Sequence, residues 1–440
     1  MILPTIDDVF GVSKSRPLSY LEREHVDGDF SRALARDDHI VIYGASKQGK
    51  TSLWQKHLED YDPVVVRCEP NTTKESIYAS LLRQLDIQLQ VGSTSERGGS
   101  IDIGSSVSAE ARIPLFAKGT VSGKAGGHAS RMNQMSFETV RFRLDEAQSV
   151  SEILLRRGFS QSVILENFHY LSESMQSDLA FDLKTFHELN VRFIIVGIWQ
   201  ESNFLLHFNP DLLDRLIEIP VEPWHEGEFD QIIQKGCEKL RFQISGAIRS
   251  YFASRACNNV GLLQDFIRKF CHLHGKQEGD DDTRLLYNWD HVHTAIQSKL
   301  DLQRGHLIKR LQSISTKSRP RSDSEDPLVL PYYLVRAICE LPLDTLRRGV
   351  SKRQLRDYIR RVHHRADGIS PRDSDITNLL NHLGQYQKPT KSPFLAYSSE
   401  TRLLRVVDAR QLFVLENSDR HKILAEIQHP LHEHVMDMEE

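Results

Sequence analysis

Eight consecutive residues, Gly44 to Thr51, have the types and the spacing needed to bind a polyphosphate. They read Gly-Ala-Ser-Lys-Gln-Gly-Lys-Thr, which fills every position of the phosphate-loop pattern G-x-x-x-x-G-K-T. Glycines let backbone N–H groups surround a phosphate, and the start of a helix favours an anion there. Lys50 is placed to reach the β- and γ-phosphates, and the Thr51 hydroxyl is placed to complete a Mg²⁺ shell. The motif predicts binding of a nucleoside triphosphate, with ATP and Mg²⁺ as the expected ligands.

The flanks of this loop have the order that the motif requires. Residues 39–43 (His-Ile-Val-Ile-Tyr) form a short apolar run, and residues 52–58 are compatible with a helix. The alternative interpretation is a glycine-rich turn that matches the motif by chance, and such a turn would not require a strand before it and a helix after it. The residues expected to contact the nucleotide in this segment are Gly44, Ala45, Ser46, Lys47, Gln48, Gly49, Lys50, Thr51 and Ser52.

The elements that must position the loop alternate between strand and helix signals. Further apolar strands are predicted at 63–68, 162–165, 192–197 and 217–220, and helices at 73–85, 138–156 and 174–188. Strands separated by helices predict an α/β fold with a parallel sheet. Residues 225–274 and 284–315 are mostly helical in pattern.

A different composition interrupts this pattern between Val91 and Gln134. Apolar residues fall on odd positions from Ile101 to Ala117, and polar ones fall on even positions. This period of two predicts an amphipathic β-hairpin inserted into the core. Three interpretations stay open: a surface flap, an assembly or partner surface, and a membrane-inserting hairpin.

The C-terminal part predicts a separate module. Helices are expected at 332–340, at 351–362 and at 374–383, and a hairpin at 394–397 and 403–407. Three helices followed by a hairpin is the order of a winged helix-turn-helix domain. The predicted domains are a P-loop ATPase core at 1–224 with the insertion at 91–134, a helical lid at 225–315, a linker at 316–327, a winged-helix domain at 328–425, and an acidic tail at 426–440.

Composition excludes several classes and leaves a charge asymmetry. The 440 residues include 39% hydrophobic and 26% charged side chains, and no apolar run is long enough to span a membrane. The first residues have no basic signal-peptide region, and the five scattered cysteines fit thiols of a reducing cytosol, so a cytoplasmic protein is expected. A zinc site at Cys271 to His274 lacks a second ligand pair. Residues 317–422 hold 20 Lys/Arg against 13 Asp/Glu, which suggests a polyanionic partner or merely a well-solvated face.

Acidic and amide side chains follow the predicted strand at 162–165. Glu166 and Asn167 come directly after it, followed by Phe168 and His169. With the phosphate loop and the C-terminal pattern, these residues make the chain resemble the P-loop ATPases of the AAA+ and STAND groups, especially the origin-recognition-like branch with a C-terminal winged helix. In that group the strand ends in two acids. The resemblance implies that Glu166 holds the magnesium water, with Thr51, and that Asn167 replaces the acid that polarises the attacking water.

This departure from the group's pattern predicts slow hydrolysis. An amide cannot take a proton from water as a carboxylate can, so binding should survive while turnover is weak or uses Glu166 or His169. The alternative is that Asn167 and His169 only cap the next helix or pack locally.

The resemblance implies four further site residues. Tyr20 and Arg23 would lie beside the adenine, and Gln200 would sense the γ-phosphate. Arg215 would face a neighbouring nucleotide or the γ-phosphate as an arginine finger. Plain surface roles are the alternatives for Tyr20, Arg23 and Arg215. The lid arginine of the group is absent from Asn259 to Gln264, and Arg268 lies one turn later.

Two functions from different classes follow. The first is an ATP-binding switch that assembles with a protein partner or with further copies of itself, in signalling or anti-phage defence. The second is an ATPase whose winged helix binds duplex DNA through Arg353, Arg356, Arg360 and Arg361. The third helix of the module is poor in basic residues, which weakens the second function.

Overall fold

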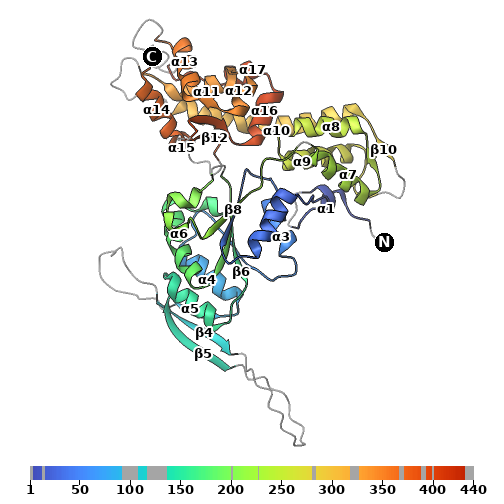
Figure 1. Cartoon of the computed structure of the whole chain (residues 1–440). Helices are drawn as coiled ribbons and strands as arrows, with labels where there is room; N and C mark the ends of the chain where they lie inside the picture. Colours follow the sequence, from blue (N-terminus) through green and yellow to red (C-terminus); the bar gives the residue numbers. More distant parts are fainter. Residues whose placement is uncertain are drawn as a thin grey trace, which may run out of the picture. The chain divides into compact units, whose positions relative to one another are not determined.

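Five parallel strands form the central sheet, in the order β2-β6-β7-β1-β8. Figure 1 labels two of them, β6 and β8. Their bounds are β1 His39–Tyr43, β2 Val64–Arg67, β6 Ser162–Glu166, β7 Arg192–Gly197 and β8 Leu216–Pro220. Their Val- and Ile-rich runs suit strands that are buried on both faces. Strand β1 lies between β7 and β8, with Tyr43 opposite Gly197 and Pro220. The phosphate loop therefore leaves the carboxyl edge of the sheet from an inner strand. The order of strand, loop and helix is the one that the sequence predicted.

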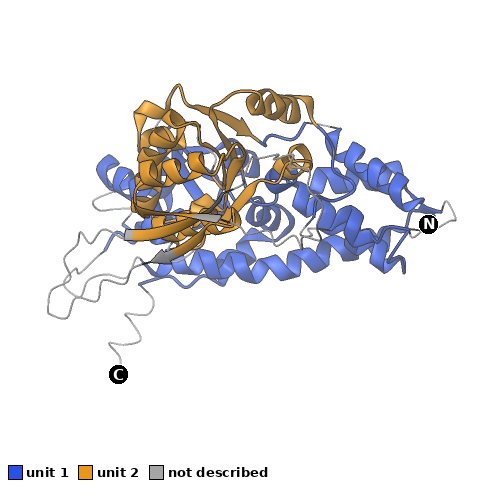
Figure 2. Cartoon of the chain, turned by 90° about the horizontal axis from the view of Figure 1, so that it is seen from below, with its two compact units in different colours: residues 1–22, 45–52, 221–440 blue, residues 23–44, 53–220 orange. Residues whose placement is uncertain are grey.

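The computed structural model describes residues 3–11, 15–91, 108–115, 136–199, 202–225, 227–279, 284–317, 327–365, 371–387, 393–398 and 401–431. The chain forms two compact units (Figure 2). Unit 1 comprises residues 1–22, 45–52 and 221–440, and unit 2 comprises residues 23–44 and 53–220. The phosphate loop thus belongs largely to unit 1, although it begins at the end of a strand of unit 2.

Unit 2 is the sheet with its covering helices. The helices are α2 Asp29–Leu34, α4 Lys74–Gln84, α5 Ala147–Arg156 and α6 Glu173–Glu188, and the short turns are η1 Glu24–Gly28, η2 Phe168–Tyr170, η3 Phe204–His207 and η4 Pro210–Leu212. Alternate strand residues such as Val41, Val163 and Phe193 share one buried cluster with residues of α4, α5 and α6. Ile40, Ile164 and Ile194 are buried as well. Helix α3, Lys50–His57, continues the phosphate loop.

The insertion contributes to a second, antiparallel sheet of unit 2. It consists of β3 Gln88–Val91, β4 Ser108–Leu115 and β5 Ser136–Arg143. In β4 the predicted alternation is confirmed, because Ala109, Ala111 and Ile113 are buried while Arg112 is exposed. The rest of the segment 91–134 lies outside the described residues.

The helix predicted at 138–156 is wrong over its first part. Residues up to Arg143 belong to β5, and the helix α5 starts only at Ala147. Glu138, Val140 and Phe142 alternate with Thr139 and Arg141, which is a strand period. Glu110 of β4 lies opposite Arg141 and pairs with it at 2.7 Å, so cross-strand pairing stabilises this register.

Unit 1 is helical around the phosphate loop. It contains α1 Ile6–Phe10, α7 Glu228–Leu240, α8 Gly246–Arg255, α9 Val260–Leu273 and α10 Trp289–Thr316, with the short parallel strands β9 Gln243–Ile244 and β10 Leu285–Leu286. Polar side chains cap three of these helices: Ser245 caps α8, Asn259 caps α9 and Asn288 caps α10. The mostly helical character predicted for 225–274 is confirmed.

The C-terminal module also belongs to unit 1. Its helices are α11 Leu330–Glu340, α12 Leu343–Arg348, α13 Lys352–Val362, α14 Asp373–Asn381, α15 Leu383–Tyr386, α16 Ala409–Asn417 and α17 Arg420–Ala425. The predicted hairpin is present as β12 Leu395–Ser398 and β13 Leu403–Val406, and β11 Val350–Ser351 joins it. The predicted third helix is divided into α14 and α15. Residues 318–326 of the expected linker lie outside the described residues.

Candidate nucleotide-binding site

The phosphate loop has the backbone conformation that its glycines predict. Gly49 has a φ of 89°, a left-handed conformation that glycine adopts without strain. A Cβ at Gly49 would meet nothing nearer than the Trp224 ring at 4.0 Å. The backbone conformation, rather than crowding, therefore requires glycine at this position.

Lys50 and Thr51 start helix α3. The Lys50 ammonium donates a hydrogen bond to the Ala45 carbonyl oxygen at 2.6 Å, so its side chain folds back over the loop. Lys50 is buried, whereas Thr51 is exposed at the first turn of α3. A cation, a hydroxyl and the amides of a helix N-terminus at one loop are the groups that hold a triphosphate with Mg²⁺. The residues present therefore fit ATP and its metal ion.

Gln48 joins the loop to other parts of unit 1. It is 2% exposed, and its amide nitrogen donates to the Glu222 carboxylate and, at 2.9 Å, to the Asn258 carbonyl oxygen. Its amide oxygen accepts from Trp224 Nε1 at 2.9 Å and from the Val260 amide at 3.4 Å. The side chain of Gln48 therefore holds the loop in place, and only its backbone is left to contact the phosphates.

The start of α9 packs directly against the loop. Asn259 Nδ2 donates to the Ser46 carbonyl oxygen at 3.0 Å, and the Gly261 amide donates to the Lys47 carbonyl oxygen at 3.1 Å. A Cβ at Gly261 would lie 2.5 Å from Lys47 Cβ, so this close approach requires glycine. Lys47 Nζ lies 3.6 Å from Asp265, one turn further along α9. A change in the loop conformation at Ser46 or Lys47 would therefore alter these contacts with α9.

Asp265 is shared among three cations. Lys299 of α10 donates to it at 2.5 Å, and Arg268 lies 3.4 Å from it. Arg268 also pairs with Asp7 at 3.3 Å, so the structure places this arginine in ion pairs on α1 and α9. Burial lowers the pKa of Lys47, and the nearby Asp265 raises it. The loop lysine thus belongs to a network that extends from the phosphate loop to α10.

Glu166 and Asn167 lie at the end of β6 in unit 2. Glu166 is 7% exposed, and its carboxylate accepts a hydrogen bond from Trp54 Nε1 at 2.6 Å. Trp54 lies on α3, three residues after Thr51. Asn167 has a φ of 62° and precedes the short helix η2, so its backbone turns the chain sharply after the strand. His169 packs on Tyr170 with ring centroids 4.3 Å apart.

Tyr20 and Arg23, two further predicted site residues, have partners near them in the chain or on α7. The Tyr20 carbonyl oxygen accepts from Lys235 Nζ at 2.6 Å, and Arg16 lies over the Tyr20 ring. Arg23 is buried, and its amide donates to Asp27 at 2.7 Å. Gln200 lies outside the described residues. The roles of Tyr20, Arg23 and Gln200 at a nucleotide stay predictions.

Arg215 precedes strand β8 on unit 2. One of its guanidinium nitrogens donates to the Asp211 carbonyl oxygen at 2.5 Å, and another lies 3.5 Å from Glu188. Its side chain is 28% exposed, so part of it reaches solvent. An arginine finger role requires a second nucleotide at this face and stays a prediction.

Away from the loop, the described residues include His, Cys, Asp and Glu side chains that could bind a metal ion, and five cysteines. Among the described residues, no group of three or more His, Cys, Asp or Glu side chains is arranged to hold a metal ion. The five cysteines are free thiols, and burial raises the pKa of Cys68, Cys237 and Cys339 to about 12. These three are therefore protonated and unreactive near neutral pH. No described helix has the length and apolar character to cross a membrane.

Sequence reasoning missed three residues at the loop: Glu222, Trp224 and Asp265. Glu222 accepts from the Ala45 amide at 3.2 Å as well as from Gln48. Trp224 comes four residues after the end of β8, and a large aromatic residue so soon after a core strand was a signal that could have been used. Asp265 has no such signal, because its contact with Lys47 spans more than two hundred residues.

The comparison with solved structures identifies the fold. A Walker-type ATPase of Pyrococcus abyssi is similar with a TM-score of 0.53 and 14% identity, over 92% of this chain and 99% of that one. Weaker likenesses include Aeropyrum pernix Orc1 in complex with DNA (TM-score 0.40, 12% identity, 93% and 98% covered) and Pyrobaculum aerophilum Cdc6p (TM-score 0.40, 13% identity, 97% and 99% covered). No protein-family model and no curated protein matches the sequence. The chain has the fold of a Walker-type P-loop ATPase, as its sequence predicted.

Proposed function

We propose that this chain is an ATP-binding switch that hydrolyses ATP slowly. The observation that carries the proposal is the packing of a complete phosphate loop against the start of α9 through Ser46, Lys47 and Gln48. ATP would bind at the loop through backbone amides, Lys50 and Thr51, and Mg²⁺ would use Thr51 and a water held by Glu166. Because α9 contacts the same loop, a nucleotide-dependent change at the loop would move or stiffen α9.

The residues after β6 support slow turnover. Trp54 orients the Glu166 carboxylate, whereas Asn167 offers an amide where a proton acceptor is needed. A switch needs a long-lived ATP state, and a weak general base would give one. We propose that this state assembles the chain with a protein partner or with further copies of itself, in a signalling or defence role.

A DNA-binding ATPase is the alternative function. The helices α11, α13 and α14 with the β11-β13-β12 sheet support the proposal of a winged helix. However, the arginines expected to contact phosphates are already engaged. Arg356 pairs with Asp357 at 2.7 Å and with Asp373 at 3.1 Å, and Arg360 pairs with Asp373 at 3.4 Å. These ion pairs compete with DNA and favour protein assembly as the first proposal.

The nucleotide site is tested by calorimetry on a Lys50→Ala chain. We expect ATP binding to fall below detection, because Lys50 supplies the cation at the β- and γ-phosphates. Lys56→Ala, on the same helix, is the matched control and should bind ATP normally. Circular dichroism and a thermal melt would establish that both variants fold. Unchanged ATP affinity in a folded Lys50→Ala chain would refute the site.

A further inference from the structure

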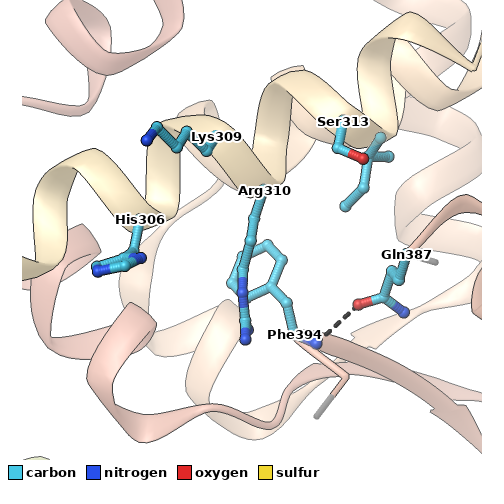
Figure 3. A pocket seen from close by; sticks show the side chains of 7 residues that line it. His306, Lys309, Arg310, Ser313, Gln387 and Phe394 are labelled. Carbon is cyan, nitrogen blue, oxygen red and sulfur yellow. Dashed lines mark hydrogen bonds between the residues drawn. The ribbon is translucent and has the colours of Figure 1, made fainter. Parts of the chain in front are cut away.

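A pocket of about 290 Å³ lies beside α10 in unit 1 (Figure 3). It is lined by His306, Lys309, Arg310, Ser313 and Ile314 of α10 and by Gln387 and Phe394 of the C-terminal module. The lining residues of α10 recur every three or four positions, so they share one face of the helix. None of them belongs to the phosphate loop or to its α9 partners.

Among the described residues, three polar side chains of this face have no internal partner. Within the described part of the chain, no hydrogen bond or ion pair engages the side chains of His306, Lys309 or Ser313. Figure 3 shows them along α10 beside Arg310. Each can donate a hydrogen bond, since lysine carries three N–H groups, serine one O–H and histidine at least one N–H. The pocket therefore presents unused donors.

Arg310 adds a partly compensated charge to these donors. Its side chain is 18% exposed, and one nitrogen lies 3.2 Å from Asp408. The same carboxylate accepts two hydrogen bonds from Arg410, each of 3.1 Å. One carboxylate thus serves two guanidinium groups, and burial lowers the pKa of Arg310. An additional anion would compensate the second guanidinium.

The other wall of the pocket is fixed and partly apolar. Gln387 accepts from the amides of Phe394 and Leu395 at 2.7 and 2.8 Å, and it donates to the Leu395 carbonyl oxygen at 2.8 Å. Its amide is therefore committed to holding the start of the hairpin in place. Phe394 and Ile314 supply carbon surface, which suits the organic part of a ligand rather than a bare ion.

We propose that this pocket binds a phosphate group, with Arg310 and Lys309 as its charged contacts. A tetrahedral phosphate offers enough acceptor oxygens for a guanidinium, an ammonium, a hydroxyl and an imidazole together, whereas a carboxylate offers two. The phosphate belongs either to a small phosphorylated ligand or to a nucleic-acid strand. Because the pocket joins α10 to the start of β12, an occupied pocket would fasten the C-terminal module to α10.

The test measures binding to the full-length chain carrying Lys50→Ala, which removes the phosphate loop as a competing site. Pyrophosphate and AMP are titrated by calorimetry, and a labelled oligonucleotide by fluorescence anisotropy. Adding Arg310→Gln should lower the affinity for whichever probe binds by about tenfold or more, since a charged hydrogen-bonding partner is lost. Lys309→Gln should lower the affinity for the same probe by a smaller factor. Arg310→Gln leaves Asp408 paired with Arg410, so the fold should persist.

The matched control is Arg304→Gln, which removes an arginine of α10 that pairs with Glu426 instead of lining the pocket. Weakened pyrophosphate or AMP binding in Arg310→Gln alone supports a small phosphorylated ligand. Weakened oligonucleotide binding in that variant alone supports a nucleic-acid phosphate. If no probe distinguishes Arg310→Gln from Arg304→Gln, the proposal is overturned. Lys50→Ala by itself tests the nucleotide site, so failures of the two proposals are separate.

Discussion

At the scale of single residues, Asn167 should limit the rate of ATP hydrolysis. We expect slow turnover in the wild-type chain and a rate increase of about tenfold or more in Asn167→Asp, because a carboxylate accepts a proton from water. Phosphate release at saturating ATP measures this. Asn190→Asp is the control, since Asn190 has a similar φ of 59° against 62° for Asn167. Rapid wild-type turnover that Asn167→Asp reduces would contradict the prediction.

His39 should make the stability of unit 2 depend on pH. Its ring is fully buried, with Nε2 2.8 Å from the Leu183 carbonyl oxygen and Nδ1 3.0 Å from the Phe193 amide. The amide must donate, so Nδ1 is the acceptor and the neutral ring carries its proton on Nε2. Burial lowers the pKa of His39 from 6.5 to about 4.

The direction of the pH dependence follows from which state, folded or unfolded, binds a proton first as the pH falls. Above about pH 6.5 neither state protonates this ring, and the folded state keeps its full stability. Between pH 6.5 and 4 the unfolded chain gains the proton while the folded chain does not, so the free energy of unfolding falls by about 3 kcal/mol. Denaturant unfolding at pH 7 and at pH 4.5 should show a smaller fall in His39→Gln. If the free energy of unfolding fell equally in the wild-type chain and in His39→Gln, His39 would not be the source of the pH dependence.

At the scale of elements, the packing of α9 on the phosphate loop should depend on Gly261. Gly261→Ala would bring a Cβ to 2.5 Å from Lys47 Cβ, and overpacking of this kind destabilises by about 1–3 kcal/mol. We expect a lower unfolding free energy and weaker ATP binding, since the loop must shift. Gly305→Ala is the control on α10, where nothing lies within 4 Å, and it should stabilise by about 0.5–1 kcal/mol. Normal ATP affinity in Gly261→Ala would exclude this coupling.

The elements also show which parts of the fold the sequence could predict. The core strands were readable because each is a short apolar run, such as Phe193 to Val196, between polar segments. Strand β5 was misread because its alternating Thr139 to Arg143 runs into the helical pattern that starts at Ala147. Its register depends on pairing with β4, a tertiary contact that local patterns do not contain.

At the scale of the whole molecule, the sequence predicted the phosphate loop of the candidate site but not the residues that pack against it. The phosphate loop is contiguous, so its eight residues and their flanks identified it. Its partners Glu222, Trp224 and Asp265 lie far along the chain and meet the loop only through folding. The spacing of residues along the sequence does not contain such contacts, although an aromatic residue four positions after β8, Trp224, was a usable signal.

The charge of the C-terminal module allows a last prediction that separates its two proposed roles. Residues 317–422 carry an excess of seven positive charges, yet Asp373 engages both Arg356 and Arg360. If the module binds duplex DNA, Asp373→Asn should free these arginines and raise affinity similarly on unrelated duplexes. The salt slope should then steepen by ~0.9 for each new phosphate contact. Arg356→Ala with Arg360→Ala should do the reverse.

Fluorescence anisotropy of the full-length chain on two duplexes at ~50 mM salt, where phosphate contacts are strongest, measures both effects. Asp344→Asn is the control, because it changes the net charge of the same module equally at an exposed residue of α12. A rise in Asp373→Asn that Asp344→Asn does not reproduce would assign DNA contact to α13. If neither variant nor the wild-type chain binds, while ATP increases the mass of the wild-type particle in solution, the module serves protein assembly.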